Sequence, residues 1–158
     1  MLFRSRPSLY AAFGNKEQLF HKALGRYQTG PMSFLAEALR KSTARAVVEA
    51  IFSGFVRTQR DRDKARGCLV VSGALACGEE AETVRRELAQ LRQAIVTALR
   101  ERFERAVQDG DLPAGTDCAT LARYTATVLN GLAVQSASGA TEKELRLVSA
   151  LAMQAWPS

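Results

Sequence analysis

The chain contains little that would support catalysis or metal binding. Its 158 residues include three cysteines and a single histidine, and they contain no Cys-x-x-Cys, His-x-x-x-His or glycine-rich phosphate-binding motif. His21 has no acid or nucleophile at a typical spacing, and the pair Glu79-Glu80 is placed as charge at a helix N-terminus. We therefore expect no enzyme, no metal site and no cofactor.

The cysteines and the hydrophobic runs limit the cellular setting. Cys68, Cys77 and Cys118 are odd in number and lack the spacing of metal ligands, which indicates free thiols in a reducing compartment. Burial would raise the pKa of Cys77 or Cys118 and leave either thiol inert rather than redox-sensing. No apolar run approaches the roughly 20 residues of a membrane span, and residues 1–30 lack a signal-peptide core. We expect a cytoplasmic protein with no membrane partner.

Apolar residues recur at helical spacing through most of the chain, which predicts an all-α fold. With 47% hydrophobic and 24% charged residues, the composition is that of an ordinary globular domain. Helices are expected over 31–41, 43–60, 67–77, 80–108, 117–139 and from 141 onward. The run Leu69-Val70-Val71 would also suit a buried strand, but no partner strand with an alternating pattern exists, so a central buried helix is preferred.

Residues 5–20 predict two short helices that meet at a glycine. Ser5 is a suitable N-cap and Pro7 lies in the first turn, where its missing N–H costs nothing. Gly14 can adopt the left-handed conformation that ends the first helix. Asn15 then caps the second, with Gln18 placed to complete a capping box.

The outer surface of this segment is basic. Residues 1–30 carry +4 of the net charge of +6, as a nucleic-acid contact surface should. A short helix with small side chains can enter the major groove, and a helix N-terminus beside a lysine can bind phosphate. The alternative is an ordinary helical hairpin with a solvated basic face.

The run R-P-S-L-Y-A-A-F-G-N-K-E-Q-L-F resembles the recognition helix and following helix of TetR/AcrR-type transcriptional repressors. It fits their pattern S-x-x-[ST]-[LI]-Y-x-[HYA]-F-x-[SND]-K-[ED]-x-L. The resemblance implies a ligand-responsive dimeric repressor whose partners are operator DNA and a small-molecule effector. It assigns phosphate contacts to Tyr10 and Lys16, and base or backbone contacts to Arg6, Pro7 and Ser8.

One departure bears on DNA binding. TetR-like proteins place two more helices before this segment, whereas only residues 1–4 precede Ser5, and Phe3 and Arg4 replace the usual turn residues. A truncation, a misplaced start codon or a genuine loss of the DNA-binding half would each explain this. We expect residues 1–29 to form a partial DNA-binding domain and residues 30–158 a ligand-binding and dimerisation domain. The alternative function is a dimeric small-molecule-binding protein that has lost DNA binding.

The last two helices predict a homodimer. Arg123 is the only formal charge between Asp117 and Glu142, so this segment needs cover on more than one face. Pairing with the same helices of a second copy would supply it, and TetR-like proteins dimerise in this way. The expected interface residues are Leu121, Val128, Leu129, Leu132, Leu145, Val148, Leu151 and Ala152.

The resemblance also implies a ligand cavity among the helices expected over 31–41, 43–60, 67–77 and 80–108. Its candidate lining comprises aromatic or polar residues on otherwise apolar faces: Phe52, Phe55, Gln59, Ser72 and Phe103. The alternative is that each is simply part of the core. An apolar lining with few polar groups would suit a hydrophobic small molecule.

Overall fold

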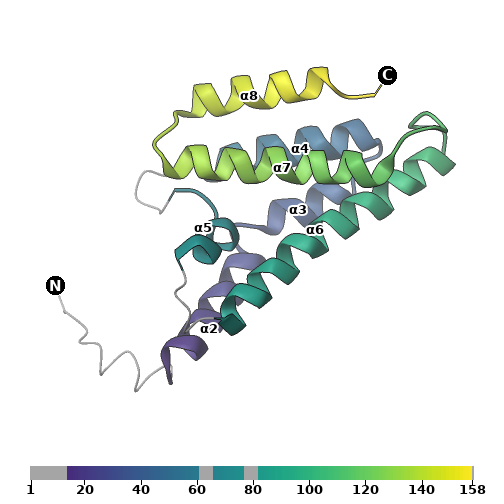
Figure 1. Cartoon of the computed structure of the whole chain (residues 1–158). Coiled ribbons are helices and arrows are strands. Elements are labelled where there is room, and N and C mark those ends of the chain that lie inside the picture. The colour runs from purple at the N-terminus through teal and green to yellow at the C-terminus, as the bar shows by residue number, and fades with distance from the viewer. Residues whose placement is uncertain (1–13, 61–65, 77–81, 158) are drawn as a thin grey trace. The chain divides into compact units, whose positions relative to one another are not determined.

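The computed structural model describes residues 14–60, 66–76 and 82–157, and all regular structure in these ranges is helical, as predicted. The helices are α2 (Lys16–Thr29), α3 (Ser33–Leu39), α4 (Ala44–Thr58), α5 (Leu69–Ala76), α6 (Glu82–Gln108), α7 (Cys118–Ala137) and α8 (Glu142–Gln154) (Figure 1). Backbone contacts divide the chain into two compact units, Met1–Ser33 and Phe34–Ser158. None of the described helices is long and apolar enough to cross a membrane.

The first unit contains the predicted start of α2. Asn15 Oδ1 accepts from the Gln18 amide at 2.9 Å, and Gln18 Oε1 accepts from the Asn15 amide at 3.2 Å, so the capping box is complete. Gly14 has a φ of +83°, a conformation that glycine adopts without strain. The helix expected before Gly14 lies outside the described residues.

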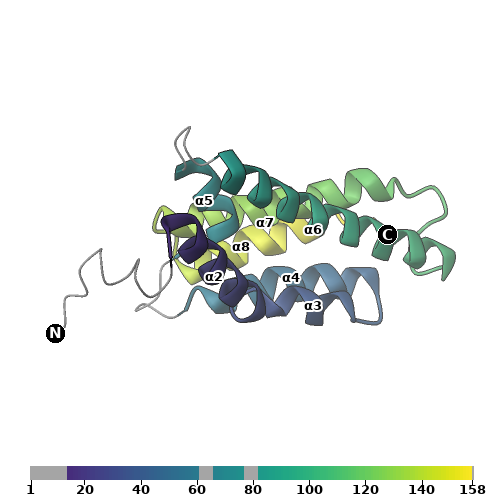
Figure 2. The same cartoon turned by 90° about the horizontal axis from the view of Figure 1, so that it is seen from below.

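The second unit packs its helices around one apolar core. α7 and α8 run antiparallel as a hairpin, α4 packs against both, and α6 crosses this layer (Figures 1 and 2). Fully covered side chains from four helices meet there, including Phe52, Leu99, Phe103, Leu132 and Leu145. Burying side chains of this size contributes roughly 1.5–3 kcal/mol each, so this core is the main source of stability.

Residues 69–76 form a helix, as preferred from the sequence, and the alternative of a buried strand is wrong. α5 begins after Cys68, whose carbonyl accepts from the amides of Val71 and Ser72. Val70 is buried, and its carbonyl also accepts from Arg92 Nη1 of α6 at 2.8 Å. The absence of a partner strand in the sequence predicted this outcome correctly.

Two polar side chains hold the turn between α3 and α4. Arg102, only 8% exposed, donates from Nη2 to the carbonyls of Lys41 and Ser42, each at 3.0 Å. On the other side of the turn, Asp111 Oδ2 accepts from the Ala44 amide at 2.5 Å. Because these groups satisfy the free carbonyls after α3 and a free amide of α4, the turn is fixed to α6 and to the loop after it.

Gly54 allows α3 and α4 to pack closely. A Cβ atom at this position would lie 2.8 Å from Phe34 Cδ2 and 3.0 Å from Phe34 Cβ. This helical glycine therefore marks the close approach of α3 to α4. The cost of glycine inside a helix, about 1 kcal/mol relative to alanine, is offset by the contact with Phe34.

We predict that Gly54→Ala lowers the free energy of unfolding by about 1–2 kcal/mol, because overpacking exceeds the gain in helix propensity. Urea denaturation followed by circular dichroism measures the change. Gly25→Ala is the matched control, since nothing lies within 4 Å of a Cβ there and the substitution should stabilise α2 slightly. An increase in stability for Gly54→Ala would show that Phe34 can move aside.

Candidate functional site

The N-terminal end of α2 presents an exposed lysine. Lys16 is the first residue of the helix, and Asn15 already accepts from one of the first-turn amides. Further along α2, Lys22 and Arg26 are also exposed. The other residues expected to contact DNA, Arg6, Pro7, Ser8 and Tyr10, lie outside the described residues.

The α7–α8 hairpin presents an exposed apolar face. Its large apolar residues remain between 37% and 65% exposed: Tyr124, Val134, Leu147, Val148 and Leu151. A groove of about 960 Å³ runs between the two helices and includes four of these five residues, all except Leu147. An apolar surface of this kind is typical of a protein–protein contact.

The predicted interface residues divide between this groove and the core. Val128, Leu132, Leu145, Val148, Leu151 and Ala152 all line the groove, whereas Leu121 and Leu129 do not. Leu121, Leu129, Leu132 and Leu145 are 9% exposed or less, so they are covered mainly by their own chain. Among the predicted interface residues, the exposed apolar area therefore belongs chiefly to Val148 and Leu151.

Tyr124, Val134 and Leu147 are exposed members of this face that are absent from the predicted interface set. Tyr124, Val128 and Gly131 form a stripe at steps of four and three on α7, and all three line the groove. A second stripe on the same helix, through Ala122 and Leu129, enters the core. Separating the two stripes would have identified Tyr124 from the sequence.

Tyr124 connects α7 to α8. Its hydroxyl donates to the Ala152 carbonyl at 3.0 Å, near the end of α8. At the other end of the hairpin, Glu142 accepts from Arg60 at 2.9 Å and from Arg146 at 2.7 Å. Hydrogen bonds from these two arginines lower the pKa of Glu142. The carboxylate therefore joins the end of α4 to the start of α8.

The aromatic residues expected to line a ligand cavity are packed in the core. Phe52, Phe55 and Phe103 are 2%, 3% and 0% exposed, and Trp156 meets Phe103 edge-on with ring centroids 5.7 Å apart. Ser72 is exposed on α5. A small groove of about 380 Å³ between α4 and α8 includes Phe52 alone of the five expected residues.

Gln59 is the centre of a buried hydrogen-bond network. Its Oε1 accepts from the Gly67 amide at 2.8 Å and from Ser136 Oγ at 2.9 Å. Its Nε2 donates to Thr58 Oγ1 at 2.8 Å and to the Gly67 carbonyl at 3.3 Å. The amide therefore binds both backbone groups of Gly67 and joins α4 to α7, which leaves it little capacity to bind a ligand.

Gly67 is suited to this position. It has a φ of +96°, and a Cβ there would lie 3.1 Å from Ala137 Cβ and 3.2 Å from the Ala133 carbonyl. Both the conformation and the close approach to α7 favour glycine. The backbone at Gly67, two residues before α5 begins, therefore lies directly against α7.

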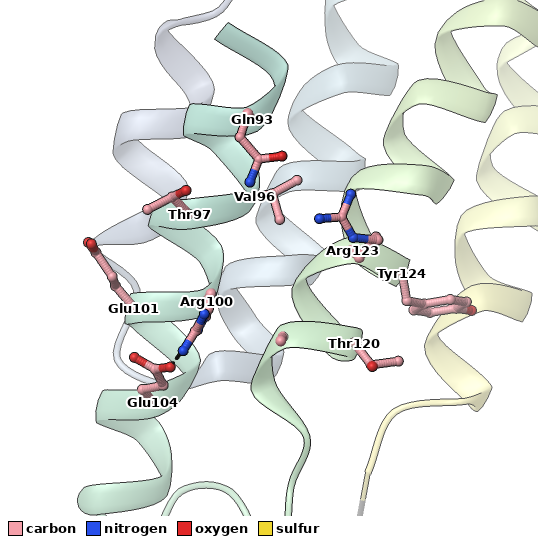
Figure 3. Close-up of a pocket in the computed structure, with 10 residues that line it drawn as sticks. Gln93, Val96, Thr97, Arg100, Glu101, Glu104, Thr120, Arg123 and Tyr124 are labelled. Atoms are coloured by element: carbon pink, nitrogen blue, oxygen red, sulfur yellow. Dashed lines mark hydrogen bonds and ion pairs between the residues drawn. The ribbon is translucent and has the colours of Figure 1, made fainter. Parts of the chain in front are cut away.

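A second hollow lies between α6 and α7. It has a volume of about 600 Å³ and is lined by Gln93, Val96, Thr97, Arg100, Glu101, Glu104, Ala119, Thr120, Arg123 and Tyr124 (Figure 3). Arg100 Nε and Glu104 Oε1 lie 2.6 Å apart, and this contact raises the pKa of Arg100. At the start of α7, hydrogen bonds from Thr120 lower the pKa of Asp117. This hollow is more polar than the cavity predicted from the sequence.

The described cysteines differ in environment. Cys118 is 9% exposed, and burial raises the pKa of its thiol, as expected for an inert cysteine. Cys68 is half-buried just before α5. Cys77 lies outside the described residues. No group of three or more potential metal ligands occurs among the residues that the structure describes.

We predict that Gln59→Ala lowers the free energy of unfolding by about 2–4 kcal/mol, because it leaves both polar groups of Gly67 and the Ser136 hydroxyl without a partner. Chemical denaturation measures the loss, and Gln90→Ala, at an exposed position of α6, should change stability by less than about 0.5 kcal/mol. Equal stability of the two variants would contradict the structural role of Gln59.

Comparison with known proteins identifies the family. The family model described as "Tetracyclin repressor-like, C-terminal domain" matches residues 43–151. The chain is 25% identical to the HTH-type transcriptional repressor ComR of Escherichia coli (strain K12), over 96% of this chain and 73% of ComR. It is 28% identical to the HTH-type transcriptional repressor BdcR of the same strain, over 94% of this chain and 71% of BdcR.

A solved structure agrees with these sequence matches. A cysteine mutant of the TetR family transcriptional regulator CifR, complexed with 26-bp operator DNA, superposes with a TM-score of 0.87. The two chains are 40% identical, and the match covers 97% of this chain and 81% of the CifR chain. The resemblance noted in residues 5–20 therefore extends through the whole helical body, and the chain belongs to the TetR family of transcriptional regulators.

Proposed function

We propose that this protein is a homodimeric, ligand-responsive transcriptional repressor that binds operator DNA, and not an enzyme. The observation that carries the proposal is the similarity over 97% of the chain to a regulator whose structure is complexed with operator DNA. The exposed apolar face of α7 and α8 supports the dimer, because an unpaired face of this kind favours association.

DNA contact is assigned to residues 1–29. In this proposal Lys16 and Tyr10 bind phosphates, and Arg6, Pro7 and Ser8 contact bases or backbone. The exposure of Lys16 at the first position of α2 supports its role, since the helix dipole adds to the attraction of its ammonium group for phosphate. Two such segments in one dimer would contact half-sites about 34–36 Å apart or a multiple of that distance.

Residues 30–158 are proposed to bind an effector and to dimerise. A hydrophobic small molecule would use the aromatic lining of Phe52, Phe55 and Phe103. All three side chains are covered by their own chain, so the effector would have to separate α4 from α6 or α8 to reach them. Opening a packed core in this way is one means by which a ligand stabilises a second conformation.

We predict that Lys16→Ala weakens binding to all DNA duplexes by a similar factor. It should also make the slope of log K against log[salt] shallower by about 0.9, because one phosphate contact is lost. Fluorescence anisotropy with a 26-bp duplex at several salt concentrations measures both changes. Lys41→Ala, which removes the same charge from an exposed turn of the second unit, should leave the slope unchanged. Identical slopes for the two variants would exclude a phosphate contact at Lys16.

We predict that Leu151→Glu converts the dimer to monomers, because a carboxylate buried in an apolar interface costs about 2–5 kcal/mol of association free energy. Leu151 is 65% exposed in the single chain, so its substitution should preserve the fold, whereas Leu129 at 7% belongs to the core. Sedimentation equilibrium measures the association and circular dichroism checks the helical content. Ala36→Glu, at an exposed site on α3, is the control. A folded Leu151→Glu dimer would place the interface elsewhere.

A further inference from the structure

We propose that the hollow between α6 and α7 is a binding site for a small organic carboxylate, with Arg123 as the group that receives the carboxylate. This inference goes beyond the proposed function, because it assigns a ligand class to a site outside the aromatic core. Its volume of about 600 Å³ lies within the range of small-molecule sites.

Arg123 is a cation without a partner in the part of the chain that the structure describes. It is the only charged residue of α7, and no hydrogen bond or ion pair of its guanidinium occurs within the described residues. Several exposed arginines of this unit are paired, among them Arg45 with Glu49, Arg100 with Glu104 and Arg146 with Glu142. Among the described arginines that have no such pair, Arg123 is distinguished by its place in the lining of a hollow. A guanidinium left unpaired beside a hollow is free to bind an anion.

The direction of the side chains favours this use. In Figure 3 Arg123 extends from α7 toward Gln93 and Val96 on α6, which face it across the hollow. In the same view Glu101 extends to the other side of α6, away from Arg123. Arg100, which also lines the hollow, is already held by Glu104. The charge presented at the Arg123 end is therefore positive.

The surrounding groups define the ligand. A guanidinium donates two parallel hydrogen bonds to a carboxylate, and the amide of Gln93 can supply a further donor from the opposite helix. Val96, Ala119 and part of the Tyr124 side chain give the same hollow an apolar portion, and the Tyr124 ring itself extends toward α8 in Figure 3. These groups match a carboxylate attached to a compact apolar body better than a bare inorganic anion, which would leave the apolar portion unused.

The experiment titrates the whole chain with sodium benzoate, a compact aromatic carboxylate, by isothermal titration calorimetry. A compound of this size should bind with a Kd of about 1 mM or tighter. Benzyl alcohol, which keeps the ring and lacks the charge, should bind about 10-fold more weakly. Inorganic phosphate should also bind about 10-fold more weakly, because it lacks the apolar body.

Variants locate the site. Arg123→Gln should weaken benzoate binding about 10-fold, and Arg123→Lys should weaken it less, because lysine keeps the charge and loses the two-pronged geometry. Arg105→Gln, which removes an exposed arginine from α6 outside the hollow, is the matched control and should bind as the wild type does. Circular dichroism checks that each variant is folded.

Three results would overturn the proposal. They are the absence of saturable benzoate binding up to about 20 mM, equal effects of Arg123→Gln and Arg105→Gln, and phosphate binding as tight as that of benzoate. The titration contains no DNA and measures no association of subunits. Its failure is therefore distinguishable from failure of the proposed repressor function or of the α7–α8 dimer.

Discussion

The structure depends on the need to cover α7 on two sides. This helix carries one charge in 20 residues, so it has no strongly polar face that water could solvate. One stripe, through Ala122, Thr125, Leu129 and Leu132, is buried in the core of its own chain. The other, with Tyr124 and Val134, stays exposed beside α8, where it is accessible to a partner. Folding and association therefore place separate demands on one helix.

The buried stripe of α7 includes two hydroxyl groups, each with an acceptor. Thr125 Oγ1 donates to the Leu121 carbonyl within the helix, at 2.9 Å, and Ser136 Oγ donates to Gln59 across the core. The second bond has the larger consequence, because Gln59 also holds both backbone groups of Gly67. The end of α4, the entry to α5 and the end of α7 thus share one network. A displacement of any of the three breaks hydrogen bonds in the other two.

The sequence predicted the helices well because their signals are local. The capping boxes at Asn15 and Thr141 depend on residues only three positions apart, and the box at Asn15 is found where the sequence predicts it. The interface was harder to predict because both stripes of α7 are apolar, and only packing reveals which one the chain covers itself. The same reason explains why Leu129 and Phe103 were chosen for binding roles while the structure places them in the core. Arg123 was recognised as an isolated charge, but its position beside a hollow depends on α6, which is distant in sequence.

Tyr124 shows how one residue can belong to two surfaces. It lines the groove between α7 and α8 and also the hollow between α6 and α7, and its hydroxyl is bonded to the Ala152 carbonyl. A molecule that displaced its ring from one side would strain a hydrogen bond on the other, and that bond joins the two helices of the exposed face. Any coupling between a ligand in the hollow and association through α7 and α8 has its shortest physical path through this residue. The coupling would be reciprocal, since association that fixed Tyr124 would change the affinity of the hollow by the same factor.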